Sequence, residues 1–292
     1  MHKDAKRELS TRLPKFESLE VTAHSMLDEI GKRTGEPEIR TEISPIDKTM
    51  LGLHPSRLLT LAARPAVGKT SVACQLAYNV ARLGVKTAFI SLEMTAENIL
   101  ERMMCSHYQI EGWKLSAKYL TPEIKKKFGF FLKDAQTLPL QIIDDYCFTE
   151  KELYTLIDHL KFRPEVIVLD HLQHIRSEQK RSQYESLTGY LAYLKETAMR
   201  YKISLVVLSQ INRSGEEAPT LGNLKGTGAI EEMSDYVVFL HDNKSIGNNV
   251  SLNNNFDLVI AKNRFGACGK KTMSFDAERY RLNDLEIPYK TY

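Results

Sequence analysis

A short loop that ends in Gly68-Lys69-Thr70 is the strongest chemical signal in the sequence. It follows an apolar run at residues 57–63 and precedes a segment with helical periodicity. Successive backbone N–H groups in such a loop, together with the start of the helix, form a concave site for phosphate oxygens. The lysine neutralises the β and γ phosphates, and the threonine hydroxyl coordinates Mg²⁺. We therefore predict a nucleoside triphosphate site, and its binding residues are Arg64, Pro65, Ala66, Val67, Gly68, Lys69, Thr70 and Ser71.

Three polar residues stand at the ends of three other apolar runs. Glu93 follows AFISL, Asp170 ends EVIVLD and Gln210 ends ISLVVLSQ. The carboxyl ends of parallel strands meet at one edge of a sheet, where such sheets bind ligands. There Asp170 can bind Mg²⁺ beside Thr70. Glu93 can polarise an attacking water as general base, and Gln210 can contact the γ-phosphate. A strand-end aspartate is also common as a helix or turn cap, but capping does not explain all three positions.

These residues are positioned by apolar runs that alternate with helical segments. The runs cover 57–63, 85–92, 138–144, 165–170 and 203–210, and the helical segments cover 71–84, 95–108, 121–135, 149–162 and 184–201. Strands that are apolar on both faces and alternate with helices predict an α/β fold, a mostly parallel sheet with helices on both faces. The last runs, 236–240, 256–262 and 270–276, have no helices between them and predict an antiparallel C-terminal extension.

The composition changes before about residue 45, on the usual boundary error of ~2–4 residues. The first 16 residues are rich in lysine and arginine, and residues 17–33 then carry apolar side chains at helical spacing. We divide the chain into an N-terminal arm and linker helix, 1–44, and a main domain, 45–292. The helix has no neighbour in its own segment to cover its apolar stripe, so it must pack on the main domain, on another subunit or on a partner.

The composition places the protein among soluble globular proteins. The 292 residues are 42% hydrophobic and 26% charged, with a formal net charge of +3. This balance excludes a disordered chain, and there is neither a run long enough to span a membrane nor a secretion signal. The four cysteines are far apart in sequence and form no CxxC pair, which argues against a zinc cluster or a disulfide framework. We expect a cytoplasmic protein, in a bacterial cell or a phage-infected host.

Taken together, the motifs resemble a known family. They match the C-terminal motor domain of DnaB-type replicative helicases, which are RecA-like ATPases with a P-loop NTPase core. The resemblance covers about residues 40–282 in the family's own order. Ala63, where the general loop pattern has Gly, is also usual in this family. The matching segments are LLTLAARPAVGKTSVACQLAYNVA, FISLEMTAENILERM, VIVLDHLQHI, VVLSQINRS, PTLGNLKGTGAIEEMSDYVVFL and VIAKNRFGACGKKTMSFD.

The resemblance implies an activity and roles for the residues above. Members of this family form ring-shaped hexamers that hydrolyse ATP at subunit interfaces and translocate on single-stranded DNA. By motif, Lys69 and Thr70 bind ATP and Mg²⁺, and Asp170 is the second Mg²⁺ ligand. Glu93 is then the catalytic carboxylate, and Gln210 senses the γ-phosphate.

Two further basic positions match the family. Arg264, with Lys262, matches the element that reaches into the neighbour's site as an arginine finger, a planar cation that stabilises charge on the transferring phosphoryl group. The alternative is that both are solvated charges on a strand edge. Arg102 matches a position near the nucleotide, and the alternative is a solvated arginine on a helix surface.

The segment 219–235 resembles the family's central-channel loop. Its candidate DNA-binding residues are Lys225, Gly226, Thr227 and Gly228. Glycine lets backbone N–H groups approach phosphate closely, and Lys225 adds a charge contact that salt weakens. The family has an acidic residue in place of Gly226. The charged run 176–183 resembles a second channel loop, although such a run is also common as solvated surface. Neither has interleaved aromatic residues, so we expect contacts to the DNA backbone without sequence preference.

Full-length relatives in this family carry a separate helical N-terminal domain, which forms a collar and engages primase. The sequence begins close to the linker helix, which by resemblance packs on the adjacent motor domain. Primase or a helicase loader is therefore a further candidate partner. The alternative function is an accessory DNA-binding ATPase, an assembly or loading factor of a phage or mobile element that does not unwind DNA.

Two other residue types are expected to be structural. His171 and His174 are three residues apart, but no further ligand follows at useful spacing, which favours packing or surface roles over a metal site. Trp113 is the only tryptophan, and we expect it to anchor a core.

Overall fold

The structure is a computed structural model of the chain. It describes residues 18–31, 35–144, 152, 155–156, 159–172, 183–211, 218–224, 227–242 and 255–285. The chain forms two compact units, Met1–Glu36 and Pro37–Tyr292. The first contains helix α1 (Leu19–Gly31). The second contains the sheet and the remaining helices.

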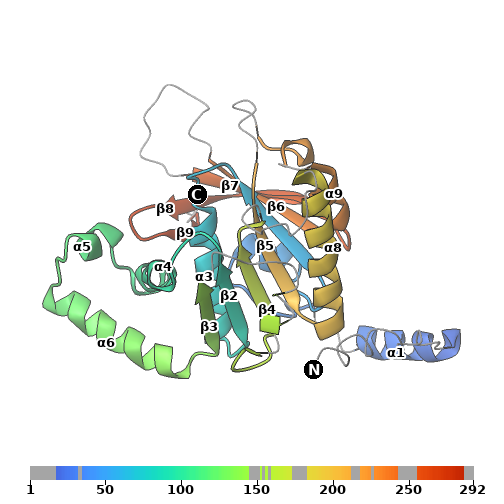
Figure 1. Ribbon diagram of the computed structural model, residues 1–292, viewed down its shortest axis with the longest axis horizontal. Coiled ribbons are helices and arrows are strands. Elements are labelled where there is room, and N and C mark those ends of the chain that lie inside the picture. Colours follow the sequence, from blue (N-terminus) through green and yellow to red (C-terminus); the bar gives the residue numbers. More distant parts are fainter. Residues whose placement is uncertain are drawn as a thin grey trace, which may run out of the picture. The chain divides into compact units, whose positions relative to one another are not determined.

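In the described part of the second unit, nine strands form one sheet in the order β3-β2-β4-β5-β1-β6-β7-β8-β9 (Figure 1). The strands from β3 to β6 in this order pair in parallel, and β7, β8 and β9 extend the sheet in antiparallel pairs. Their bounds are β1 (Leu58–Ala63), β2 (Thr87–Ser91), β3 (Leu140–Asp144), β4 (Val166–Asp170), β5 (Ser204–Gln210), β6 (Tyr236–Asp242), β7 (Asn255–Asn263), β8 (Gly269–Asp276) and β9 (Arg281–Asp284).

Helices cover both faces of this sheet, and each face has its own apolar core. Alternate side chains of β1 enter different cores: Leu59 and Leu61 pack on one face and Leu58 and Ala62 on the other. The first core includes side chains of α3 and α4, and the second those of α8 and α9 (Figure 1). The helices of this unit are α2 (Ser44–Thr49), α3 (Lys69–Arg82), α4 (Ala96–Tyr108), α5 (Gly112–Ser116), α6 (Pro122–Thr137), α8 (Gln183–Tyr201), the 3-10 helix η3 (Leu221–Asn223) and α9 (Thr227–Met233).

The predicted fold class is confirmed, an α/β fold with a mostly parallel sheet, helices on both faces and an antiparallel C-terminal extension. Each predicted apolar run contains a strand, and the central ones are buried along their whole length. The short elements α5, α9 and β9 were not predicted. Half of the predicted helix at 149–162 lies outside the described residues.

The unit boundary between Glu36 and Pro37 comes somewhat before the boundary we expected at residues 44 and 45. The reason is packing. Ile39 pairs with Leu53 as an isolated bridge, and Ile43 is only 1% exposed in the core of the second unit. Residues 37–44 are therefore held by that unit.

Helix α1, considered by itself, carries an apolar stripe. Leu19, Met26, Leu27 and Ile30 are all exposed. Among the helices of the described ranges, none combines the length and apolar character that crossing a bilayer requires.

Candidate nucleotide site

The phosphate loop joins the end of β1 to the start of α3. Gly68 precedes the helix with a left-handed backbone, φ 101°. A Cβ added at this position would lie 2.7 Å from the ring of Phe275, which belongs to β8. Only glycine therefore suits this position, in both backbone conformation and space. Pro65 and Ala66 are exposed, and Arg64 and Val67 are partly so, which leaves the outer side of the loop open to a ligand.

Lys69 begins α3 and points into a buried region beside two carboxylates. Lys69 is only 8% exposed. Burial lowers the pKa of the Lys69 ammonium, while the nearby charges of Asp170 and Glu93 act in the opposite direction. A buried cation at the start of a helix is a favourable partner for phosphate oxygens.

Asp170 ends β4 beside this lysine and is fully buried. Burial raises the pKa of its carboxyl, and the Lys69 ammonium opposes the rise. The Thr70 hydroxyl lies beside the carboxyl and also opposes the rise in its pKa, but neither carboxylate oxygen accepts a hydrogen bond of standard geometry from the described residues. A buried carboxylate without such donors is costly unless a cation binds it, so the site fits the Mg²⁺ predicted from the sequence. Thr70 and Asp170 would hold the ion through oxygen atoms.

The sheet register brings the predicted residues to one edge. Ser91 pairs with Asp170, and Ala63 pairs with Gln210. Because β2, β4 and β5 are neighbours, Glu93 and Gln210 reach the edge on either side of Asp170. Glu93 is 48% exposed, as a residue that meets water must be.

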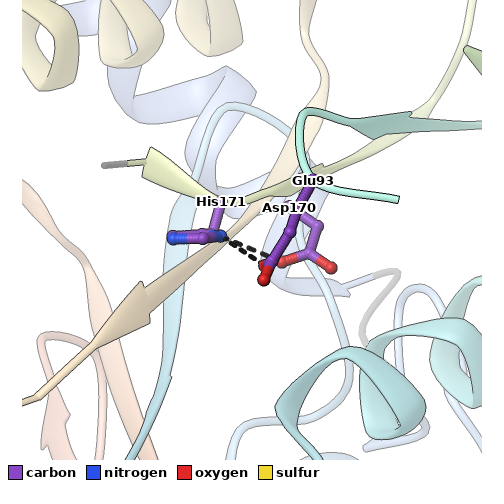
Figure 2. A group of neighbouring side chains, drawn as sticks. All are labelled: Glu93, Asp170 and His171. Atoms are coloured by element: carbon purple, nitrogen blue, oxygen red, sulfur yellow. Dashed lines mark ion pairs between the residues drawn. The ribbon is translucent and has the colours of Figure 1, made fainter. Parts of the chain in front are cut away.

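His171 lies in the middle of this edge, although its sequence position gave no reason to assign it to the site. Its Nδ1 is 3.0 Å from Oε2 of Glu93, and its Nε2 is 3.3 Å from Nε2 of Gln210. Polar atoms of Glu93, Asp170 and His171 lie within 4.8 Å of one another (Figure 2). The spacing between His171 and His174 in the sequence did not reveal the neighbours of His171, because these come from other strands. His174 lies outside the described residues.

Arg102 is held beside the phosphate loop. Its NH1 donates to the Ser71 hydroxyl at 3.0 Å, and its guanidinium lies 4.8 Å from the ring centre of Tyr280. The contact with Ser71 places this arginine next to the predicted nucleotide site. An arginine that was merely solvated on the helix surface would contact neither Ser71 nor Tyr280.

Lys262 and Arg264 lie at the opposite edge of the sheet. Asn263 pairs with Tyr236 at the start of β6, and Tyr236 pairs with Leu59 near the start of β1. The phosphate loop follows the other end of β1. A strand rises about 3.3 Å per residue, so the six-residue β1 separates the two edges by roughly 17 Å. Arg264 therefore cannot reach the phosphate loop of its own chain.

The two cations are held there by α9 and the residues after it. Arg264 NH2 donates to the Glu232 carbonyl at 2.9 Å, and its NH1 is 3.5 Å from Oδ1 of Asp235. Lys262 Nζ donates to the Glu231 carbonyl, and burial lowers the pKa of this lysine.

Asp235 is the buried anchor of this edge, at 2% exposure. Its carboxylate accepts from the backbone N–H of Leu58 at 2.8 Å and from the ammonium of Lys195 in α8. Its backbone carbonyl also accepts from the N–H of Arg264 at 3.0 Å. Asp235 thus joins β1, α8 and the turn after β7.

The predicted DNA-binding residues are only partly covered by the structure. Lys225 and Gly226 lie outside the described residues, as does most of the predicted second loop at 176–183. Thr227 begins α9, and Gly228 is exposed in its first turn. The prediction for Trp113 is wrong, because it is 55% exposed and stacks on Tyr119 with ring centres 6.4 Å apart.

Comparison with known proteins agrees with this geometry. The family described as "DnaB-like helicase C terminal domain" matches residues 38–284. The chain is 27% identical over 292 residues to the replicative DNA helicase DnaB of Geobacillus stearothermophilus, covering 97% of this chain and 64% of that protein. The chain thus spans less than two thirds of this relative.

Two solved structures share the fold. One is described as an ATPase domain, with a TM-score of 0.86, 21% identity, and coverage of 93% of this chain and 100% of that one. The other is a DnaB-like replicative helicase described with its interactions with primase, with a TM-score of 0.85, 21% identity, and coverage of 92% of this chain and 69% of that one.

Proposed function

The chain belongs to the DnaB-like helicase C-terminal domain family, and on that premise we propose that it is an ATP-driven motor that moves along single-stranded DNA. One observation carries the proposal. The phosphate loop and its carboxylates lie at one edge of the sheet, and the cations Lys262 and Arg264 lie at the other. One chain cannot combine them, so two neighbouring copies form each complete site.

The carboxyl edge, where the parallel strands β1, β2, β4 and β5 end, supplies the binding and proton-transfer groups. Lys69 neutralises the β and γ phosphates, and Arg102 supports the start of α3 through Ser71. Glu93 accepts the proton of the attacking water as general base. Gln210 donates to the γ-phosphate and so distinguishes a triphosphate from a diphosphate. Mg²⁺, when bound by Thr70 and Asp170, neutralises the charge that develops on the phosphates.

Arg264 of the neighbouring copy completes the reaction site, with Lys262 beside it. A guanidinium at the transferring phosphoryl group contributes roughly 10³–10⁵ in rate for enzymes of this mechanism. To reach the neighbour, Arg264 exchanges its contacts with the Glu232 carbonyl and Asp235 for the phosphate oxygens.

DNA contacts are assigned to the segment that ends in α9. Lys225, Gly226, Thr227 and Gly228 would contact the phosphates of one strand, which gives binding without sequence preference and with a strong salt dependence. The family resemblance favours a hexameric ring, in which these segments line the channel and α1 packs on the adjacent motor domain. The apolar stripe of α1 needs a surface to cover it, and the resemblance assigns that surface to the adjacent motor domain. Primase is a candidate partner, because a structural neighbour is described with it.

The proposal is tested by two assays on the purified chain. ATP hydrolysis is measured with and without single-stranded DNA, and strand displacement is measured on a forked duplex. We expect hydrolysis that DNA stimulates, together with displacement. Strong DNA-stimulated hydrolysis without displacement at any protein concentration would indicate the accessory ATPase. A chain that hydrolyses ATP at full rate as a dilute monomer would contradict the shared site.

A mixing experiment tests the shared site directly. Lys69→Ala removes the phosphate cation and Arg264→Ala removes the cation offered to the neighbour, so each pure variant should be inactive. In mixed assemblies, a Lys69→Ala subunit can still offer Arg264 to an intact phosphate loop, and some activity should return. Native mass measurement with an ATP analogue confirms assembly and gives the number of subunits. Absence of rescue in assembled mixtures argues against action in trans.

A further inference from the structure

The ring of His171 lies between Glu93 and Gln210 and is 1% exposed. Its two nitrogen atoms face different partners: Nδ1 is 3.0 Å from Glu93 Oε2, and Nε2 is 3.3 Å from Gln210 Nε2. Figure 2 shows the ring edge directed at the carboxylates of Glu93 and Asp170. Glu93 and His171 come after β2 and β4, and Gln210 ends β5, and these three strands are neighbours in the sheet. The contacts therefore form one row across the carboxyl edge.

The chemistry of the partners defines the role of each ring nitrogen. An ionised carboxylate only accepts hydrogen bonds, and an amide nitrogen only donates them. A neutral imidazole that carries its hydrogen on Nδ1 satisfies both partners. Nδ1–H then faces Oε2 of Glu93 at 3.0 Å, a polar contact outside standard hydrogen-bond geometry, and Nε2 accepts a hydrogen bond from Gln210. Asp170 Oδ1 is farther away, 3.8 Å from Nδ1, and does not compete for this hydrogen.

We propose that His171 is a positioning residue that orients the carboxylate of Glu93 and connects it to Gln210. This inference rests on the proposed function, in which Glu93 is the general base and Gln210 contacts the γ-phosphate. By holding Oε2, the imidazole leaves the other carboxylate oxygen for the attacking water. A base that is oriented by a third group is a common arrangement in hydrolytic sites.

The connection also links the two ends of the row. When Gln210 turns its amide toward a γ-phosphate, the donor to His171 Nε2 changes. The ring that holds Glu93 therefore responds to the presence of a triphosphate. Through this contact the orientation of the base differs between the states with and without a γ-phosphate.

Three substitutions separate the two contacts. His171→Leu removes both. The amide nitrogen of asparagine lies near the position of Nδ1, so His171→Asn keeps a donor for Glu93. The amide of glutamine extends to the position of Nε2, so His171→Gln keeps a partner for Gln210 only. The matched control is His54→Leu, which removes a similar histidine–glutamate pair, with Nδ1 2.7 Å from Oε2 of Glu38, away from the carboxyl edge.

The kinetic constants of ATP hydrolysis without DNA give the readout. We expect His171→Leu to lower kcat about 10–100-fold while KM changes less than about threefold, because orientation of the base is lost and binding is not. The kcat of His171→Gln should fall as far as that of His171→Leu, and His171→Asn should retain most of the wild-type kcat. The His54→Leu control should have the kcat of the wild type. Circular dichroism and binding of an ATP analogue confirm that each variant is folded. If His171→Leu does not fold, the asparagine and glutamine variants carry the comparison.

A double substitution tests the connection. Gln210→Ala combined with His171→Leu should be no slower than the slower single variant, because both break the same row. Multiplied losses would overturn the link, as would an unchanged kcat in His171→Leu, a change in KM alone, or an asparagine variant as slow as the leucine one. If the wild type hydrolyses ATP and His171→Leu does so at the same rate, only this inference fails. If the wild type hydrolyses no ATP with or without DNA, the proposed function fails and the inference falls with it.

Discussion

The two edges of the sheet hold their charges in different ways. At the carboxyl edge, Lys69 and Asp170 are buried, and the oxygens of Asp170 accept no hydrogen bond of standard geometry from the described residues. At the amino edge, the opposite edge where Lys262 and Arg264 lie, Asp235 is equally buried. It accepts hydrogen bonds from a backbone N–H and from Lys195, and Arg264 donates to a backbone carbonyl. The first edge is therefore arranged for a ligand. The charged groups of the second edge already have partners within their own chain. Its cations must therefore give up these contacts before they can bind a phosphate of a neighbouring copy.

The largest effect is expected at Arg264, which we propose acts on the neighbouring copy. Arg264→Ala should lower the turnover of ATP by roughly 10³–10⁵ while leaving its affinity unchanged, because the arginine stabilises only the transferring phosphoryl group. Single-turnover hydrolysis and binding of an ATP analogue measure the two quantities. Weakened binding with normal turnover would place Arg264 outside the reaction site. Arg163→Ala, which removes an exposed arginine bonded to the Tyr201 carbonyl, is the control.

Lys69→Ala affects the carboxyl edge and should act on affinity. Removing a buried cation that faces several phosphate charges costs about 4 kcal/mol, or roughly 10³-fold in the dissociation constant for ATP. Isothermal titration with an ATP analogue measures this change. Lys262→Ala, at the other edge, should bind nucleotide normally. Retained tight binding in Lys69→Ala would rule out the phosphate-loop assignment.

Asp235→Ala tests whether the amino edge is structurally self-sufficient. The substitution leaves Lys195 and the Leu58 N–H without their shared carboxylate. We expect the free energy of unfolding to fall by about 3 kcal/mol, the lower end for a broken buried pair because Lys195 is partly exposed. Urea unfolding measures it. Asp284→Ala, which removes a more exposed pair with Lys271, should cost much less. Equal losses in both variants would contradict the difference between buried and exposed pairs.

Gly68→Ala probes the shape of the phosphate loop. The new Cβ would need a left-handed backbone and would meet the Phe275 ring, so we expect a loss of about 2 kcal/mol in stability together with weaker nucleotide binding. Gly84→Ala is the matched control, because Gly84 also has a positive φ, 86°, but nothing lies within 4 Å of its added Cβ. It should lose stability through backbone strain alone and bind nucleotide normally. If both variants behave alike, Phe275 does not shape the loop.

The smallest effect is expected away from both edges, at His107 in α4. Burial, with the charges of Arg82 and Arg281, lowers the pKa of this imidazole from 6.5 to about 4. Protonation therefore favours the unfolded chain. The stability that the neutral ring contributes is complete above pH 6.5 and is lost as the pH falls toward 4. Because the ring is only about half buried, the effect should be well under 2 kcal/mol.

Urea unfolding at several pH values between about 7.5 and 4.5 checks this prediction. The free energy of unfolding should fall less steeply in His107→Gln than in the wild type, with His159→Gln as the exposed control. An identical slope in all three proteins would show that His107 does not contribute.

The fold was predictable because its signals are local. Parallel strands buried on both faces need continuous apolar runs, and β4 and β5 are such runs in the sequence. The polar residues at the ends of these runs, Asp170 and Gln210, then marked the carboxyl edge. Short polar elements such as β9 gave no comparable signal, because their place is set by pairing with β8 rather than by their own composition.

The role of His171 could not be predicted from spacing along the chain. Its partners come from β2 and β5, and the order of strands in the sheet is not a local property of the sequence. The prediction that Trp113 anchors a core was wrong because burial, too, depends on how the elements pack. Tryptophan is usually well buried, but α5 leaves this ring 55% exposed. The assignments of Lys225, Gly226, Thr227 and Gly228 to DNA, and of Arg264 to a neighbour, stay predictions.

The antiparallel hairpin that carries Arg264 also has a consequence for assembly symmetry. If Arg264 acts on the next copy, each contact joins two unlike surfaces. One is the amino edge of one protomer, and the other is the carboxyl edge of its neighbour. Repeated head to tail, such a heterologous contact closes into a ring when its rotation divides a full turn, and otherwise continues as a helical filament. Every protomer would then face the same way around the axis, which gives the assembly a direction before any DNA enters it.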